Sequence, residues 1–348
     1  PEPSLRDALR QITQPIKDFT RASAALKWGI NFPYFLEGVV YFGVLTLLTK
    51  FLSEDVALGD VVSGWVVAAL TGGITGSMFL LGNISDRWGL RRALLFSLAF
   101  LVLGRVALAL GATLHLSTGL GGGMFYVELL AIALVVVGYG AYQPATYAGV
   151  KLYTDKKTEA MGFAMVYAVM NLARFVAGLL SPPVRRWSVG VFPPSGIAGV
   201  FWLYMGLTIL AFLATLRFVP RRDPEPAPRD NPDAPDAPAT PPAGPPARVL
   251  SARWLREHPL GDLRFLFFIF VLVPVQTLFA HNWLTMPQYI ERAFRHAPYI
   301  SDNFEFFSNI NPLLIFVMTP LVAALTARAN VYWMMIAGTS VMAAPAFQ

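Results

Sequence analysis

The feature that most constrains this chain is a recurring run of apolar residues, each long enough to cross a lipid bilayer. About 18 or more apolar residues form a helix that spans the roughly 30 Å of hydrocarbon. Such runs recur through the 348 residues, and the pattern predicts an all-α integral membrane protein. We expect nine spans, at residues 29–52, 61–81, 93–111, 124–145, 162–181, 197–218, 263–284, 306–325 and 331–347.

Composition agrees with this prediction and narrows the chemistry. Hydrophobic residues make up 55% of the chain and charged residues only 14%, whereas a soluble domain is about 25% charged. There is no cysteine, which excludes disulfides and thiolate metal sites. The sequence contains no HExxH, GxxxxGK[ST] or GxSxG motif. We therefore expect no enzyme, no metal and no cofactor.

The positions of the basic residues predict the orientation. The segments that we place on one side of the membrane carry twenty Lys and Arg residues, and those on the other side carry five. Because cytoplasmic loops are enriched in basic residues, we expect the amino terminus in the cytoplasm and a plasma or inner membrane location. The same bias explains the net charge of +6 without nucleic acid as a partner.

The chain divides into four expected parts. Residues 1–28 form a basic amphipathic segment, residues 29–219 a six-helix bundle, residues 220–262 a Pro-rich linker and residues 263–348 a partial second bundle. The two-bundle layout is incomplete because only three spans follow the linker, which suggests a truncated sequence. We expect a monomer in the lipid bilayer.

Residues 82–92 read GNISDRWGLRR and join the second and third expected spans. Eleven residues allow only a tight loop, so the two spans are expected to be antiparallel neighbours. Gly82 would allow close approach of another helix, and Asp86 would face the positive end of the next helix. The arginines could hold carboxylates across the seam between the bundles.

This stretch resembles the loop motif between the second and third helices of the major facilitator superfamily. The residues that we assign to the motif are Gly82, Asp86, Arg87, Gly89, Arg91 and Arg92. The resemblance implies two helical bundles related by pseudo-two-fold symmetry. It also implies a substrate site near the midplane that is exposed to each side in turn.

A finer resemblance is to the proton-dependent oligopeptide transporter family. The first span carries Glu37, Tyr41 and Gly43 at positions of that family's first-helix motif, with Tyr34 in place of a glutamate and Gly38 in place of an arginine. Three further stretches are similar: Gly138, Gly140 and Pro144 with Gln143 in place of a lysine; residues 167–171; and residues 311–313 with Pro320.

Glu37 is the candidate proton carrier. It lies about eight residues into its span, roughly 12 Å deep, with Tyr34 and Tyr41 one turn away on the same helix face. Ionisable residues inside a membrane are costly and are functional candidates by default. The alternative is that Glu37 pairs statically with an arginine from another helix.

The candidate substrate-binding residues are polar or aromatic and lie deep in spans or beside prolines. They are Tyr34, Tyr41, Gln143, Asn171, Arg174, Gln276 and Asn311. Arg174 could anchor a substrate carboxylate or pair with Glu37, or it could form a structural ion pair. We expect Arg105 to be structural and Glu128, near a helix end, to be solvated.

These features favour a secondary transporter that couples a proton to symport of a small peptide-like or zwitterionic molecule. Two alternatives stay open. One is an exporter or a carrier of a non-peptide metabolite, and the other is a membrane sensor or scaffold that does not transport.

Overall fold

A computed structural model describes residues 23–114, 116–154, 159–221, 263–316, 318 and 331–343. The chain divides into two units, residues 1–225 with 283–334 and residues 226–282 with 335–348. The expected amphipathic segment up to residue 22 and the Pro-rich linker from residue 222 lie outside the described residues.

Six helices of the first unit are long and apolar enough to span a membrane, and they agree with the first six expected spans. Their bounds are Ala25–Asp55, Gly59–Leu81, Leu90–Thr113, Gly123–Leu152, Met165–Ser188 and Ile197–Phe218. The first is a continuous helix in three parts, η1 (Ala25–Asn31), α2 (Phe32–Lys50) and η2 (Phe51–Asp55), of which η1 and η2 are π-helical. The others are α3 (Gly59–Leu81), α5 (Leu90–Thr113), α6 (Gly123–Leu152), α7 (Glu159–Ser188) and α8 (Ile197–Phe218).

Two helices run further than their apolar runs predict. We expected ends at residues 145 and 181, but α6 continues through Pro144 and α7 continues through Pro182 and Pro183. Membrane helices tolerate proline because neighbouring helices and side chains satisfy the freed backbone groups. Hydrophobicity therefore marked the apolar part of each helix and missed the final turns.

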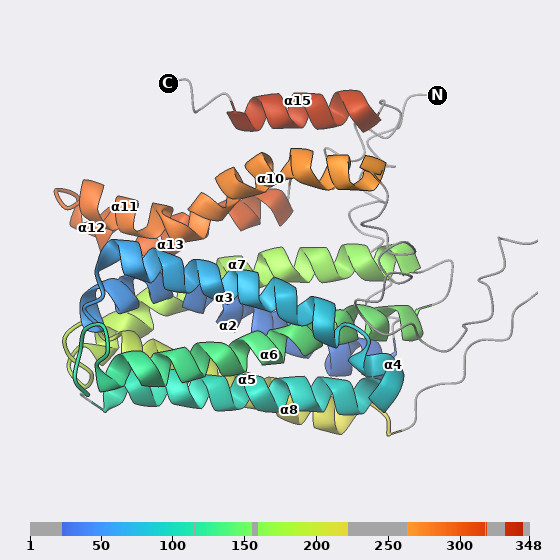
Figure 1. The fold of residues 1–348 in the computed structure, drawn as a ribbon, viewed down its shortest axis with the longest axis horizontal. Helices are drawn as coiled ribbons and strands as arrows, with labels where there is room; N and C mark the ends of the chain where they lie inside the picture. Colours follow the sequence, from blue (N-terminus) through green and yellow to red (C-terminus); the bar gives the residue numbers. More distant parts are fainter. Residues whose placement is uncertain are drawn as a thin grey trace, which may run out of the picture. The chain divides into compact units, whose positions relative to one another are not determined.

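The first unit is a bundle in which α2 packs against α7 and α8, α5 packs against α6 and α8, and α3 packs mainly against α6 (Figure 1). The prediction that the second and third spans are direct neighbours is therefore wrong. A short helix, α4 (Ile84–Trp88), forms the connection between α3 and α5 and contacts both α5 and α6. Gly89 follows α4 with a φ of 81°, a conformation that glycine adopts without steric cost.

Beyond the linker, α10 (Leu263–Leu284) has the bounds of the seventh expected span. Three short helices follow, α11 (Met286–Ala293), α12 (Pro298–Ser301) and α13 (Phe304–Ser308). The prediction of one continuous helix from residue 306 is wrong, because α13 ends at Ser308 and a new helical stretch begins at residue 311. Pro312 has no N–H with which to continue the earlier helix.

The ninth expected span is represented by α15 (Val331–Ala343). Residues 319–325 of the eighth expected span and residues 344–347 of the ninth lie outside the described residues. The count of nine spans therefore stays a prediction.

Candidate functional site

The interior of the six-helix bundle contains a chain of three buried polar side chains. Glu37 of α2 is 1% exposed, and its Oε2 accepts a hydrogen bond of 2.9 Å from the hydroxyl of Tyr139 on α6. Nη2 of Arg105, on α5, donates to the same hydroxyl at 3.1 Å. Tyr139 therefore bridges an acid and a base that come from two other helices.

This arrangement lies between the two interpretations that we gave for Glu37. Arg105 is the cation that interacts electrostatically with Glu37, but a tyrosine hydroxyl stands between the two groups. A hydroxyl can donate and accept, so it stays bonded whether the carboxyl is ionised or neutral. The sequence pointed to Glu37 and Arg105 separately and missed Tyr139, although Tyr139 lies one turn from Gln143 on α6.

Tyrosine side chains of α2 and α6 contact one another on the helix faces that carry Glu37 and Tyr139. The hydroxyl of Tyr34 makes a long hydrogen bond of 3.5 Å to Oε1 of Gln143, and its ring stacks on Tyr142 with a centroid distance of 6.4 Å. Tyr41 meets the ring of Tyr139 edge to face at 5.0 Å. The structure thus brings together Tyr34, Tyr41 and Gln143, three of the predicted substrate-binding residues.

Arg174 and Asn171 lie in a different environment. Nε of Arg174 donates to Oδ1 of Asn309 at 3.0 Å, and its guanidinium lies 5.4 Å from the ring centroid of Phe42 and 5.6 Å from that of Trp283. Asn171 donates to the carbonyl of its own helix, one turn earlier. Arg174 therefore joins α7 to the segment after α10, and its partner Asn309 was missed by sequence reasoning.

The two remaining predicted substrate-binding residues, Gln276 and Asn311, follow the linker. Gln276 lies in α10, in the other unit, and its side chain is outside those that the structure describes. Asn311 is exposed in the first turn after the break that follows α13. Asn309, two residues earlier, is the buried amide of this region.

Glu128 contradicts its prediction. We expected a solvated carboxylate near a helix end, but Glu128 is 1% exposed, and both of its carboxylate oxygens lack a hydrogen-bond partner among the described residues. Glu128 lies in the second turn of α6, whose inner face packs closely on α5. Sequence position alone did not show which face of the helix it occupies.

One residue of the loop motif, Arg91, contacts another helix of the six-helix bundle. Nη2 of Arg91 donates to the carbonyl of Leu216 at the end of α8 (2.7 Å), and the expectation that the arginines hold carboxylates across the seam between the bundles stays a prediction. Asp86, Arg87 and Arg92 are exposed. At Gly82, a Cβ would meet only its own helix among the described residues, so it provides no close approach of another helix there.

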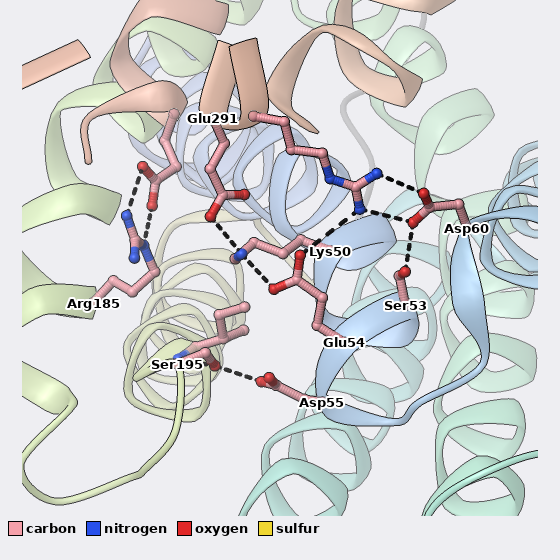
Figure 2. A network of polar contacts seen from close by, with 11 residues as sticks. Lys50, Ser53, Glu54, Asp55, Asp60, Arg185, Ser195 and Glu291 are labelled. Carbon is pink, nitrogen blue, oxygen red and sulfur yellow. Dashed lines mark hydrogen bonds and ion pairs between the residues drawn. The ribbon is translucent and has the colours of Figure 1, made fainter. Parts of the chain in front are cut away.

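A dense set of ion pairs lies at one end of the first unit, which we call the capped end. It comprises η2, the first turn of α3, the last turns of α7, and α11 to α13 (Figure 2). Nζ of Lys50 lies 2.6 Å from both Glu54 and Glu291. Arg292 binds both carboxylate oxygens of Asp60 at 2.6 and 2.9 Å. These contacts join the first two membrane helices to the helix that follows α10.

A second, more deeply buried pair lies between α7 and α13. Arg185 binds both oxygens of Glu305 at 2.5 and 3.3 Å, and Nη2 of Arg185 also donates to the carbonyl of Asp302 at 3.0 Å. The side chain of Glu305 is 1% exposed. Burial raises the pKa of Glu305, and the Arg185 guanidinium opposes that rise.

The same two segments approach closely at Gly178. A Cβ on Gly178 would lie 2.8 Å from Cβ of Asn309, so glycine permits the close contact between α7 and the segment after α13.

The fold and the site define a class: a multi-pass helical membrane protein with buried charge inside one bundle and ion pairs that close one end. The sequence model of the Major Facilitator Superfamily matches residues 30–347. The chain therefore belongs to the major facilitator superfamily.

Two solved structures have a similar fold. The crystal structure of the peptide transporter POT in complex with sulfate is 15% identical, with a TM-score of 0.54, over 88% of this chain and 69% of that chain. A bacterial homologue of the human drug peptide transporters PepT1 and PepT2 is 16% identical, with a TM-score of 0.56, over 88% and 72%.

Among curated proteins, the "Probable metabolite transport protein CsbC" of Bacillus subtilis (strain 168) is 28% identical over 170 residues. That match covers 47% of this chain and 35% of the relative, so the chain spans about a third of the relative's length.

Proposed function

We propose that the protein is a secondary active transporter that couples a proton to the symport of a small peptide-like or zwitterionic solute. The observation that carries this proposal is the buried chain of Glu37, Tyr139 and Arg105 inside a bundle of membrane helices. An intramembrane carboxyl with a bridging hydroxyl can accept a proton without losing its partner. The fold shared with peptide transporters supports the substrate class.

The capped end supports alternating access. Its contacts are ion pairs and side-chain hydrogen bonds between elements far apart in sequence. At the exposed rim, water can replace pairs such as Arg292 with Asp60 when the elements separate. In this proposal the capped end is the closed outer gate, and the amino terminus faces the cytoplasm of a cell with the protein in its plasma or inner membrane. A membrane protein of this class moves solute and needs no catalytic residue.

The full-length protein in proteoliposomes provides the test. Imposing an inward proton gradient should drive accumulation of di- or tripeptides. Glu37→Gln should abolish gradient-driven accumulation while leaving exchange of labelled for unlabelled substrate, because exchange needs no net proton movement. Tyr126→Phe is the control, since that ring on α6 is 61% exposed and lies outside the elements of the capped end, so both activities should be unchanged. Gradient-driven accumulation by Glu37→Gln at the wild-type level would contradict the role of Glu37.

A second candidate, a carrier or exporter of a non-peptide metabolite, is favoured by the match to a protein named for metabolite transport. It is also favoured because Gln143 and Gly38 stand where the peptide family has a lysine and an arginine. Proteoliposomes that ignore peptides but exchange a labelled metabolite, or extrude it against its gradient, would select this candidate. Absence of flux for every solute, with a folded protein, would select a sensor or scaffold.

A further inference from the structure

A buried carboxyl that the proposed site does not use lies at the other end of the same helix seam. Glu128 of α6 is 1% exposed, and neither of its carboxylate oxygens has a hydrogen-bond partner among the described residues. Its Oε1 lies against Gly111 of α5, where any Cβ would overlap it. The glycine thus provides the space that the carboxyl occupies.

An ionised carboxylate is very costly in such a place. Burying an ionised group without a partner costs far more than burying a neutral one, and the group takes up a proton instead. Among the described residues, no cation of α5 or α6 bonds to Glu128. Arg105, a buried cation on α5, donates to Tyr139. The surroundings therefore favour the neutral acid.

Glu128 lies on the same stripe of α6 as Tyr139, the residue that bonds to Glu37. Residues 128, 132, 135 and 139 follow one another at helical spacing on the inner face of α6, and all are buried. Eleven residues separate Glu128 from Tyr139, which is roughly 16 Å along the axis. A small cavity occupies the turns between them, lined by Arg105, Leu108, Ile132 and Val135 among others.

We propose that Glu128 is a second proton-binding site of the bundle, separate from Glu37, which holds its proton while the seam between α5 and α6 is dry. Hydration of the seam at Gly111 would allow the carboxyl to ionise and release that proton to water. The site would then exchange a proton with water when this end of the bundle opens. That consequence rests on the proposed proton-coupled function, whereas the protonated state in this conformation does not.

Infrared spectra of the full-length protein in lipid bilayers, compared between the wild-type protein and its variants, test directly whether Glu128 carries a proton. At pH 7 the wild-type protein should show a C=O stretching band of a protonated carboxyl, and Glu128→Gln should lose that band. Glu37→Gln should keep it, which assigns the band to Glu128. Identical carboxyl bands in wild-type protein and Glu128→Gln would overturn the proposal.

Gly111→Ala tests the same assignment if Glu128→Gln does not fold. Gly111→Ala should push the carboxyl from its place toward water, and the band should disappear at pH 7. Gly64→Ala is the matched control, because a Cβ there meets nothing within 4 Å among the described residues. Retention of the band in a folded Gly111→Ala protein would overturn the assignment.

Proton-to-substrate stoichiometry in proteoliposomes tests the role in coupling. Glu128→Gln should lower the number of protons moved per substrate, and an unchanged ratio would overturn that role. Failure of the proposed function would look different: the wild-type protein would show no gradient-driven uptake, while its carboxyl band remained.

Discussion

The interior of the six-helix bundle and the capped end treat charged residues in opposite ways. In the interior, Glu37 and Arg105 are joined through Tyr139, and Glu128 stands without a partner among the described residues. At the capped end, acids and bases meet directly and in larger numbers, as for Lys50 with its two glutamates.

The difference follows from the surroundings. The ionisable side chains inside the bundle are buried away from bulk solvent, so their charged forms are costly and taking up or releasing a proton is the change open to them. At the capped end the partners come from helices on either side of the long linker, and many of them are partly exposed. The exposed pairs among them, such as Arg292 with Asp60, can separate and form again at small cost. The interior is therefore suited to binding protons, and the capped end to opening and closing.

The largest expected effect is at the buried pair of the capped end. Arg185→Ala leaves the fully buried Glu305 without its cation and should destabilise the closed arrangement by about 3–5 kcal/mol. The pKa of Glu305 should rise further, so the loss should be large at pH 8 and smaller in acid, where the carboxyl is neutral. Thermal unfolding followed by tryptophan fluorescence measures it. Arg186→Ala, an exposed neighbour, is the control, and equal effects of the two variants would contradict the distinction.

Next in size is the glycine contact between α7 and α13. Gly178→Ala places a Cβ 2.8 Å from that of Asn309 and 3.0 Å from the carbonyl of Glu305, so α13 must move away. Overpacking of this kind costs about 1–3 kcal/mol. Spin labels at positions 187 and 299, both exposed, should report a longer distance, and the chain has no native cysteine to interfere. Gly72→Ala on α3, where a Cβ is free, should leave the distance unchanged; a shift there too would point to a general effect.

In the bundle interior, we expect an effect from removing the Tyr139 hydroxyl that links Glu37 to Arg105. Tyr139→Phe removes the hydrogen bonds to both Glu37 and Arg105 and should cost about 1–3 kcal/mol, because buried groups lose partners. Gradient-driven uptake should fall more than substrate exchange. Tyr126→Phe, at a ring that is 61% exposed, should change neither quantity. Wild-type coupling in Tyr139→Phe would show that the bridge has no part in proton binding.

The smallest effect is expected at the rim of the capped end. Arg292→Gln removes a pair whose side chains are 40% and 48% exposed, so the cost should be about 0–1 kcal/mol and should vanish at high salt. Hydrogen bonds to Asp60 raise the pKa of Arg292, so the effect should not depend on pH near neutrality. Unfolding at low and high salt measures it, with Arg295→Gln as control. A loss as large as that of Arg185→Ala would remove the difference between rim and core.

Much of the fold could be predicted because a bilayer requires every spanning helix to carry an apolar run of a minimum length. The first six spans and the bounds of α10 followed from hydrophobicity alone. Glu37 stood out for the same reason, since a carboxyl in an apolar run is rare. The break at Asn309 was missed because the prediction counted apolar residues and gave Pro312 too little weight.

The partners of the charged residues could not be predicted. Arg174 was a candidate partner of Glu37, but the packing of α7 places it against Asn309, and it is Arg105 of α5 that interacts with Glu37 through Tyr139. Glu128 was expected in water and lies against Gly111. These outcomes depend on helix rotation, which apolar runs in a membrane do not specify, because the faces toward lipid and toward protein are both apolar.

The sequence by itself determined that the chain crosses a membrane repeatedly, that it carries the superfamily's loop motif, and that Glu37 is buried. The repeated crossing and the burial of Glu37 follow from the cost of placing polar groups in hydrocarbon, which depends on local composition, whereas the motif is recognised from the order of its residues. Only the tertiary structure decided which groups meet: the hydroxyl bridge of Tyr139, the ion pairs of the capped end and the isolated position of Glu128. Those contacts depend on how helices far apart in sequence turn toward one another, and packing, rather than hydrophobicity, sets that rotation.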